Sequence, residues 1–295
     1  MDWHGPITAV ITPFDECGAI DPQAMQENAD RIFDAGGTGL LVGGCTGEFW
    51  ALSSDERCEL FELGVKCGND RGTILAGTGA ITVSETVFLT NAAKDAGCDG
   101  ALILPPYFIR LTDDEIFEHY QEVNAAVDFP IVLYNIPGNA INEITPELAL
   151  RLADLDNIVA IKESSGDWNN FYTTLIAVKD KLRVFCGPAS IFGVPAIAAG
   201  ADGFIDCFPN VWVPGGLDMY HAAHSGRLDA ANALQQTGRR LSDLFTSGGR
   251  SLYPATKAAM EHLGFAAGNP RSPLRPLSGT ALQQLHAGLA SLNIT

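Results

Sequence analysis

Lys162 is the residue whose type and position in this sequence point most directly to chemistry. It ends an apolar run that begins at Ile158, and a polar stretch with Gly166 follows it. Burial destabilises the charged form of a lysine and lowers its pKa, and a neutral amine can attack a ketone to form a Schiff base. Lowering a lysine pKa from about 10.4 to 7–8 requires roughly 4 kcal/mol. The alternative interpretation is a lysine that extends from the strand end into solvent.

Two other segments also place reactive groups after apolar runs. Tyr134 ends the run that begins at Ile131, and a phenol at such a position can transfer protons. An interior tyrosine with a bonded hydroxyl is the alternative. The segment Gly43–Glu48 contains a thiol at Cys45 and a hydroxyl at Thr46. Successive backbone N–H groups in such a segment can bind an anion, although a tight turn that needs glycine torsions would also explain it.

The segments that must position these groups alternate between short apolar runs and amphipathic stretches. Helix starts are indicated by Asp21 before Pro22 and by Thr112 three residues before Glu115, and Gly97 is typical of a helix end. Eight runs are predicted to be strands: Ile7–Ile11, Gly39–Gly43, Thr73–Ala76, Gly100–Leu104, Ile131–Tyr134, Ile158–Lys162, Arg183–Cys186 and Gly203–Cys207. Strands that alternate with helices form a parallel sheet, and eight of them predict a closed (β/α)8 TIM barrel of the α/β class.

Active sites of such barrels are built from the loops after the strands. Lys162, Tyr134 and Thr46 all follow predicted strands, so we expect them to face one barrel mouth. An amine, a proton carrier and an anion-binding loop together suit a carbonyl compound that bears a carboxylate. The sequence therefore predicts a small-molecule 2-oxo acid as the substrate.

The strands stop after about Pro214, and helices follow. The predicted helices cover Gly215–Ser225, Arg227–Ser247, Ser251–Leu263 and Ser278–Leu292. The first completes the outer ring of the barrel, and the other three form a C-terminal appendage. We therefore expect a catalytic barrel domain at residues 1–225 and a C-terminal helical region at residues 226–295.

Composition excludes several classes of function. The formal charge is −17, from 35 acidic and 18 basic residues, which argues against nucleic-acid binding. The seven cysteines show no metal-ligand spacing, so reduced thiols in a cytoplasmic protein are expected. No apolar run approaches the roughly 18 residues that a membrane-spanning helix needs, and the N-terminus shows no signal peptide.

Four segments, GGCTGE, YNIPG, IKESSGD and AGADGFID, make the chain resemble the dihydrodipicolinate synthase/N-acetylneuraminate lyase family of class I Schiff-base aldolases. This resemblance spans essentially the whole chain. It implies a barrel with C-terminal helices and a homotetramer built as a dimer of dimers. It also implies Lys162 as the Schiff-base nucleophile and Tyr134 as the proton-transfer residue.

The resemblance further implies which residues bind the substrate. The loop that holds Cys45, Thr46 and Gly47 would bind the substrate carboxylate, and Gly187 and Ile205 would line the floor of the pocket. No metal and no organic cofactor are expected.

Three positions depart from the synthase pattern. Cys45 replaces a threonine, Phe108 replaces a tyrosine of the proton relay, and Asn139 stands where an arginine would bind the second substrate's carboxylate. We therefore expect an aldolase that acts on pyruvate or on a longer 2-oxo acid, of the 4-hydroxy-2-oxoglutarate or 2-keto-3-deoxy sugar acid type. The alternatives are 4-hydroxy-tetrahydrodipicolinate synthase, a deoxy sugar-acid dehydratase that uses the same imine, and a non-catalytic protein that binds oxo acids.

Overall fold

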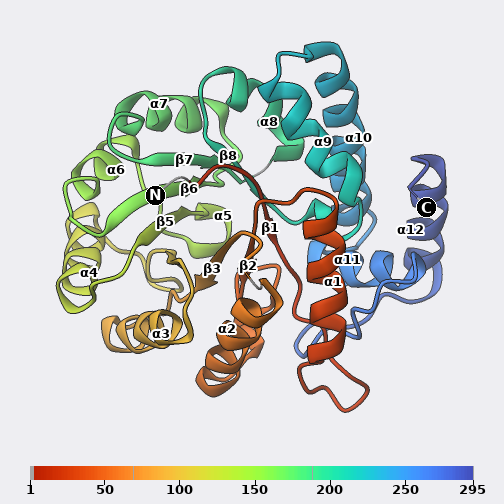
Figure 1. The fold of residues 1–295 in the computed structure, drawn as a ribbon, viewed down its shortest axis with the longest axis horizontal. Helices are drawn as coiled ribbons and strands as arrows, with labels where there is room; N and C mark the ends of the chain where they lie inside the picture. The colour runs from red at the N-terminus through yellow and green to blue at the C-terminus, as the bar shows by residue number, and fades with distance from the viewer. Residues whose placement is uncertain (1–2, 69, 188, 295) are drawn as a thin grey trace.

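The computed structural model describes residues 3–68, 70–187 and 189–294. Their strands form a closed parallel barrel in which each strand pairs with the next along the chain and the eighth pairs with the first (Figure 1). The strands are β1 Gly5–Ala9, β2 Gly39–Val42, β3 Thr73–Gly77, β4 Gly100–Ile103, β5 Ile131–Asn135, β6 Ile158–Glu163, β7 Arg183–Cys186 and β8 Gly203–Asp206. The predicted TIM barrel is confirmed.

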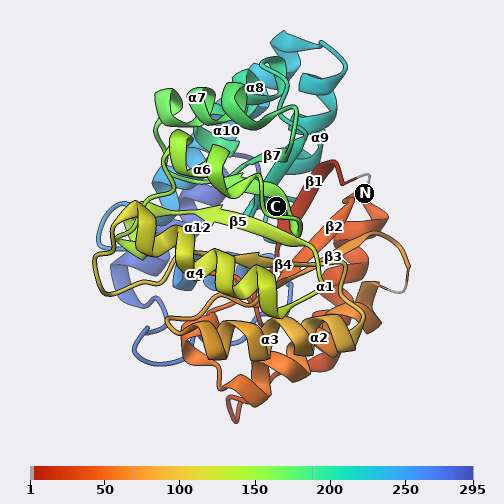
Figure 2. The same cartoon turned by 90° about the vertical axis from the view of Figure 1, so that its left-hand side faces the viewer.

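Helices cover the outside of this barrel, as the two perpendicular views show (Figures 1 and 2). The helices that follow the strands are α1 Pro22–Asp34, α2 Ser54–Gly68, α3 Val83–Ala96, α4 Asp113–Ala126, α6 Pro146–Leu152, α7 Trp168–Val178, α8 Ala189–Ala198 and α9 Val213–His224. A short helix, α5 Pro137–Ala140, lies in the loop after β5 and was not predicted from the sequence.

Local capping explains where these helices begin and end. The Asp21 side chain accepts hydrogen bonds from two backbone N–H groups at the start of α1. Thr112 and Glu115 form a reciprocal capping box at the start of α4. Gly97 ends α3 with φ +93°, a left-handed conformation that glycine adopts without steric cost. The caps predicted from the sequence at these positions are confirmed.

The first strand begins and ends two residues earlier than predicted. Its pairing with β8 already starts at Gly5, which lies opposite Gly203. A Cβ at Gly203 would lie 2.2 Å from the Gly5 carbonyl oxygen, so only glycine lets the barrel close here. At the other end, the Ile11 N–H donates to the Asn210 side chain at 3.1 Å. The apolar run therefore continues beyond the sheet pairing.

Parallel register places the two expected catalytic residues opposite each other. Tyr134 of β5 is the register partner of Lys162 of β6, and the next pair is Asn135 with Glu163. Below them the barrel interior is filled by apolar side chains from several strands, which include Ile7, Leu41, Leu75, Leu102, Val132, Ala160 and Phe185. The two expected catalytic residues thus lie at the end of a packed core.

The C-terminal helices are α10 Leu228–Thr246, α11 Leu252–His262 and α12 Gly279–Ser291. They lie together on one flank of the barrel (Figure 1). Their apolar faces form a cluster that includes Phe245, Met260 and Leu285 and that also takes in Ile11 and Phe208 from the barrel. The appendage is therefore packed against the carboxyl end of β1 and the segment after β8. A domain boundary near residue 225 stays a prediction.

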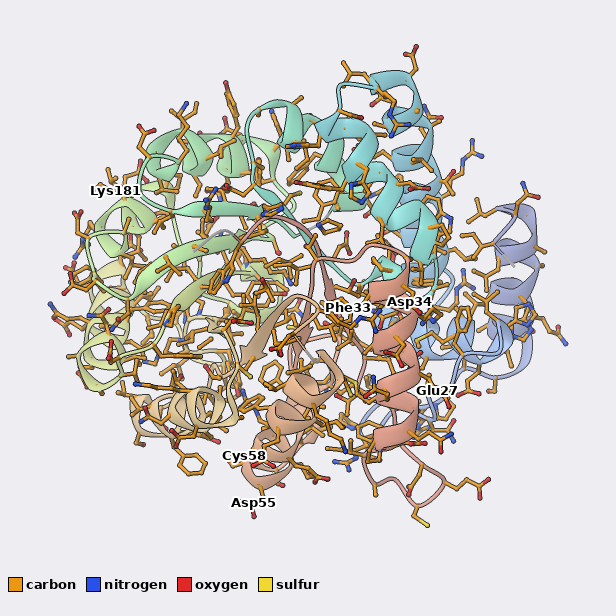
Figure 3. All side chains as sticks on the ribbon, viewed as in Figure 1. Glu27, Phe33, Asp34, Asp55, Cys58 and Lys181 are labelled. Atoms are coloured by element: carbon orange, nitrogen blue, oxygen red, sulfur yellow. The ribbon has the colours of Figure 1, made fainter. Side chains whose placement is uncertain are left out.

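Charged side chains project from the outer helices and their ends. Figure 3 shows Asp34 on α1, Asp55 on α2 and Lys181 after α7 on the outside of the ring, and all three are exposed. Within the described residues, no helix is long and apolar enough to cross a membrane.

The buried Asn210 side chain links the ends of β1 and β8. It accepts from the Ile11 N–H and donates to the carbonyls of Ala9 at 2.9 Å and Cys207 at 2.7 Å. Asn210→Ala removes this partner from the buried Ile11 N–H and Ala9 carbonyl, while the Cys207 carbonyl still accepts from the backbone N–H of residue 210. We expect the free energy of unfolding to fall by about 2–3 kcal/mol. Urea unfolding measures this change. The exposed Asn169→Ala serves as control, and an equal loss in both variants would contradict the prediction.

Candidate active site

Lys162 lies at the carboxyl end of β6, where strand meets loop. Only 5% of its surface is exposed, and its Nζ lies 4.3 Å from the centre of the Tyr134 ring. Because the two residues are register partners, the sheet itself fixes this contact. The structure therefore excludes the alternative in which Lys162 extends freely into solvent.

Burial sets the protonation states of both groups. It lowers the pKa of the Lys162 amine, and the nearby Cys45 thiol and Asp206 carboxyl oppose this shift only in part. A lower pKa enlarges the fraction of neutral amine, which is the nucleophilic form. Burial also raises the pKa of Tyr134 well above its usual value, so its hydroxyl keeps its proton at neutral pH.

The Tyr134 hydroxyl donates to the Sγ of Cys45 at 3.8 Å. Burial is the largest influence on Cys45 and raises the pKa of its thiol, while the nearby Tyr134 and Tyr253 hydroxyls oppose this shift in part. Asn139 donates through Nδ2 to the Tyr253 hydroxyl at 3.2 Å. Two phenols and a neutral thiol therefore line the cavity together with Lys162.

The loop after β2 that carries Cys45 and Thr46 is held from two sides. The Thr12 hydroxyl donates to the Gly47 carbonyl at 2.7 Å, and the Glu48 N–H donates to the Cys45 carbonyl at 3.1 Å. Glu48 itself has a left-handed backbone with φ 57°. Glycine is the usual residue in this conformation, so Glu48 must be held in place by its side-chain contacts.

A buried ion pair supplies those contacts. Glu48 Oε1 lies 2.8 Å from Lys257 Nζ, and neither side chain is more than 2% exposed. The second carboxylate oxygen accepts from the Arg271 N–H at 3.0 Å. Lys257 lies four residues after Tyr253 on α11, so both side chains project from one face of this helix. One C-terminal helix therefore holds the Cys45 loop and also reaches the Cys45 thiol.

The opposite side of the site is braced by Glu163, the residue after Lys162. Its Oε1 accepts from Asn135 at 3.0 Å, from the Ser165 N–H at 3.0 Å and from Asn170 at 3.2 Å. Asn135 in turn accepts from the Ile144 N–H at 2.9 Å. These bonds lock the ends of β5 and β6 together, directly behind Tyr134 and Lys162.

These groups surround a cavity of about 200 Å³. Its lining comes from the ends of the strands, the loops after them and the C-terminal helices: Ala9, Cys45, Thr46, Tyr134, Ile136, Lys162, Ser164, Gly187, Ser190, Ile191, Ile205, Asp206, Cys207, Phe208, Ser242, Thr246, Leu252 and Tyr253. A side chain at position 187 would collide with Ser164, because a Cβ there would lie 1.5 Å from the serine hydroxyl. The cavity can hold a small organic acid next to the Lys162 amine.

Six of the eight residues expected from the sequence line this cavity: Lys162, Tyr134, Cys45, Thr46, Gly187 and Ile205. The other two lie close to it. Gly47 is a buried residue of the same loop as Thr46, and Asn139 is exposed and bonded to Tyr253. The individual roles of all eight residues stay predictions.

Asp206 and Tyr253 are two of the lining residues that were not among the expected site residues. Asp206 ends β8, so its place after an apolar strand was a usable signal. Tyr253 comes from α11, outside the strand-end loops. No sequence pattern marks it, because only the packing of the C-terminal helices against the barrel brings it to Cys45.

Comparison with known proteins agrees with this arrangement. Residues 2–292 match the family model described as the dihydrodipicolinate synthetase family. A 4-hydroxy-tetrahydrodipicolinate synthase from Methanothrix thermoacetophila is 34% identical over 281 residues, which cover 94% of this chain and 92% of that protein. The chain belongs to the dihydrodipicolinate synthetase family. It is therefore a lyase of the Schiff-base aldolase type.

Solved structures of the family have the same fold. The dihydrodipicolinate synthase DapA-2 from Bacillus anthracis superimposes with a TM-score of 0.93 at 29% identity and 99% coverage of both chains. A chloride-inhibited dihydrodipicolinate synthase from Acinetobacter baumannii, solved in complex with pyruvate, gives a TM-score of 0.92 at 29% identity and covers 99% of both chains.

Metal chemistry has no evident site in the described part of the chain. No group of three or more His, Cys, Asp or Glu side chains there is placed to hold a metal ion.

The Glu48–Lys257 pair yields a prediction about stability. Lys257→Met leaves the Glu48 carboxylate buried without its cation, so we expect the free energy of unfolding to fall by about 3–5 kcal/mol. Adding Glu48→Gln removes the unpaired charge and should restore more than half of the loss. Urea unfolding of the single and double variants measures both changes. Additive losses in the double variant would show that the two side chains do not stabilise each other.

Proposed function

We propose that the chain is a class I aldolase that forms a Schiff base between Lys162 and pyruvate or a longer 2-oxo acid. The observation that carries this proposal is the buried amine of Lys162, paired in register with Tyr134 inside a cavity of about 200 Å³. The pyruvate complex of the Acinetobacter relative supports the substrate class.

The proposed reaction begins with imine formation. The neutral Lys162 amine attacks the C2 ketone to give a carbinolamine. Tyr134, whose hydroxyl keeps its proton at neutral pH, donates that proton to the departing C2 oxygen, and water leaves. The product is a positively charged iminium that can accept an electron pair from C3.

Cleavage then uses the phenolate that Tyr134 has become. It removes the proton from the C4 hydroxyl, the C3–C4 bond breaks, and its electron pair moves into the iminium to give an enamine and an aldehyde. Protonation at C3 and hydrolysis release pyruvate and restore the amine. The reverse sequence is a condensation. Thr46 and the adjacent loop hold the C1 carboxylate, and this fixed orientation lowers the entropic part of the barrier.

A second candidate is favoured by the names of the relatives. The Methanothrix protein and other similar proteins are named 4-hydroxy-tetrahydrodipicolinate synthase. The same imine would then condense with an aldehyde that carries its own carboxylate. Asn139, at the position expected to bind that carboxylate, offers an amide rather than a cation, and it is engaged with Tyr253. This observation favours the aldolase.

We also propose a homotetramer. Phe108 is 85% exposed and has φ +78°, a conformation that costs a bulky residue roughly 1–2 kcal/mol. Its neighbour Ile109 is 49% exposed. Contact with a second copy would bury this surface. Sedimentation should give about four times the 31.3 kDa mass of the chain, and a monomer would contradict the proposal. A cytoplasmic location stays a prediction.

Borohydride trapping tests the proposed function. Reduction in the presence of pyruvate should attach one reduced pyruvate to Lys162, because borohydride converts the imine to a stable amine. Mass spectrometry of the peptide identifies the site. Lys162→Ala should give no adduct. The control Lys181→Ala removes an exposed amine paired with Asp154 and should give the same amount of reduced pyruvate adduct as the wild type.

Two outcomes would decide against the proposal. An unmodified wild-type protein would exclude the imine, and an undiminished adduct in Lys162→Ala would place it elsewhere. Pyruvate release from a set of 4-hydroxy-2-oxo acids, compared with condensation of pyruvate and aspartate semialdehyde, separates the aldolase from the synthase.

A further inference from the structure

Asp206 places a carboxyl group in the cavity that the proposed mechanism does not use. It is the last residue of β8 and lines the cavity together with Lys162. Its Oδ2 accepts from the Ala189 N–H at 3.0 Å and its Oδ1 from the Cys207 N–H at 2.6 Å. Both oxygens are thus oriented by the backbone, and the N-terminus of α8 supplies one of the two donors.

The cavity lining carries few charged groups. Among the described lining residues, Lys162 is the only basic side chain and Asp206 the only acidic one. Burial raises the pKa of the Cys45 and Cys207 thiols and of the Tyr253 hydroxyl, so these groups stay neutral. Once Lys162 is joined to C2 of the substrate, no second lining cation is left to bind a charge on the far half of the substrate.

The remaining polar lining consists of hydroxyl groups. They come from the loop after β6, from α8 and from α10: Ser164, Ser190, Ser242 and Thr246. Within the described residues, the buried Ser164 hydroxyl has no hydrogen-bond partner. Hydroxyls can both donate to and accept from substrate hydroxyls, whereas a buried carboxylate requires a cation or several donors. The lining therefore fits an uncharged, hydroxylated group.

We propose that Asp206 selects 2-oxo acids in which the end far from the 2-oxo group is uncharged and hydroxylated. This proposal rests on the proposed function. The Asp206 carboxylate accepts hydrogen bonds from substrate hydroxyls and repels a second carboxylate. Such discrimination by an unfavourable like-charge contact is a common source of specificity. The proposal separates the two aldolase substrate types left open by the sequence, because 4-hydroxy-2-oxoglutarate carries a second carboxylate and 2-keto-3-deoxy sugar acids carry hydroxyls at the far end.

Imine trapping with matched probes tests whether Asp206 selects 2-oxo acids by their far end. The test does not require the aldehyde product of the reaction to be known. The probes are 2-oxoglutarate and 5-hydroxy-2-oxopentanoate, which has a hydroxymethyl group in place of the far carboxylate. The amount of each reduced adduct on Lys162 is measured relative to the amount of the pyruvate adduct under the same conditions. In the wild type we expect the hydroxylated probe to be trapped at least tenfold more efficiently than 2-oxoglutarate. Equal trapping of the two probes would overturn the proposal.

Substitution should shift this ratio. Asp206→Asn removes the charge and keeps a similar shape, so the preference should fall by at least tenfold. Asp243→Asn removes the same charge from an exposed side chain on α10 that is paired with Arg239, and it should leave the ratio as in the wild type. A proportional loss with every 2-oxo acid in Asp206→Asn would show that Asp206 acts on the shared chemistry or on folding, and would contradict selection.

The wild-type protein provides a second measurement that does not depend on the folding of a variant. Burial raises the pKa of Asp206 to about 6. The titratable groups that face it are Lys162 on β6, Cys186 on β7 and its neighbour Cys207. Burial raises the pKa of both thiols well above the ordinary value, so they remain neutral. Normalising to pyruvate cancels the ionisation of Lys162, because both probes need the same amine.

The preference for the hydroxylated probe should therefore fall as the pH decreases from about 8 to 5.5, while the far carboxylate of 2-oxoglutarate stays ionised. A ratio independent of pH would contradict the proposal. Failure to trap pyruvate itself would instead refute the proposed function. The two failures are therefore distinguishable in one experiment.

Discussion

The contact between the buried Lys162 amine and the Tyr134 ring is the interaction on which the rest of the structure depends. Parallel pairing of β5 and β6 puts the two residues opposite each other, and burial lowers the pKa of the amine. A shift of the pairing by one residue would turn Lys162 away from the cavity. The bonds between Asn135 and Glu163 lie in the next register pair, so the same backbone geometry fixes both the reactive amine and its support.

The C-terminal region completes this site. Helix α11 provides Lys257, which pairs with Glu48 behind the Cys45 loop, and Tyr253, which reaches Cys45 itself. Because the pair is buried, its geometry is coupled to the packing of α11 against the barrel. The appendage therefore contributes both a wall of the cavity and the support of one loop.

Much of this arrangement could be predicted from the sequence, because strand ends in a parallel barrel converge on one face. That rule placed Lys162, Tyr134 and Thr46 together, and helix caps such as Asp21 gave accurate element boundaries. The rule fails for side chains that arrive from elsewhere in the chain, as Tyr253 does. The length of the apolar run also did not predict the end of β1. There the Ile11 N–H donates to the buried Asn210 side chain rather than to a neighbouring strand.

In our proposals, chemistry and selection are divided between residues that line the same cavity. Lys162 and Tyr134 would act on the oxo-acid half that all candidate substrates share, and Asp206 on the half in which they differ. The central claim is that burial lowers the pKa of the Lys162 amine and so enlarges its neutral fraction. An NMR titration of ¹³C-labelled lysine ε-carbons, with the Lys162 signal assigned by its loss in Lys162→Ala, tests it most directly. The account predicts a midpoint well below the ordinary value of about 10.4, and a midpoint at or above that value would contradict it.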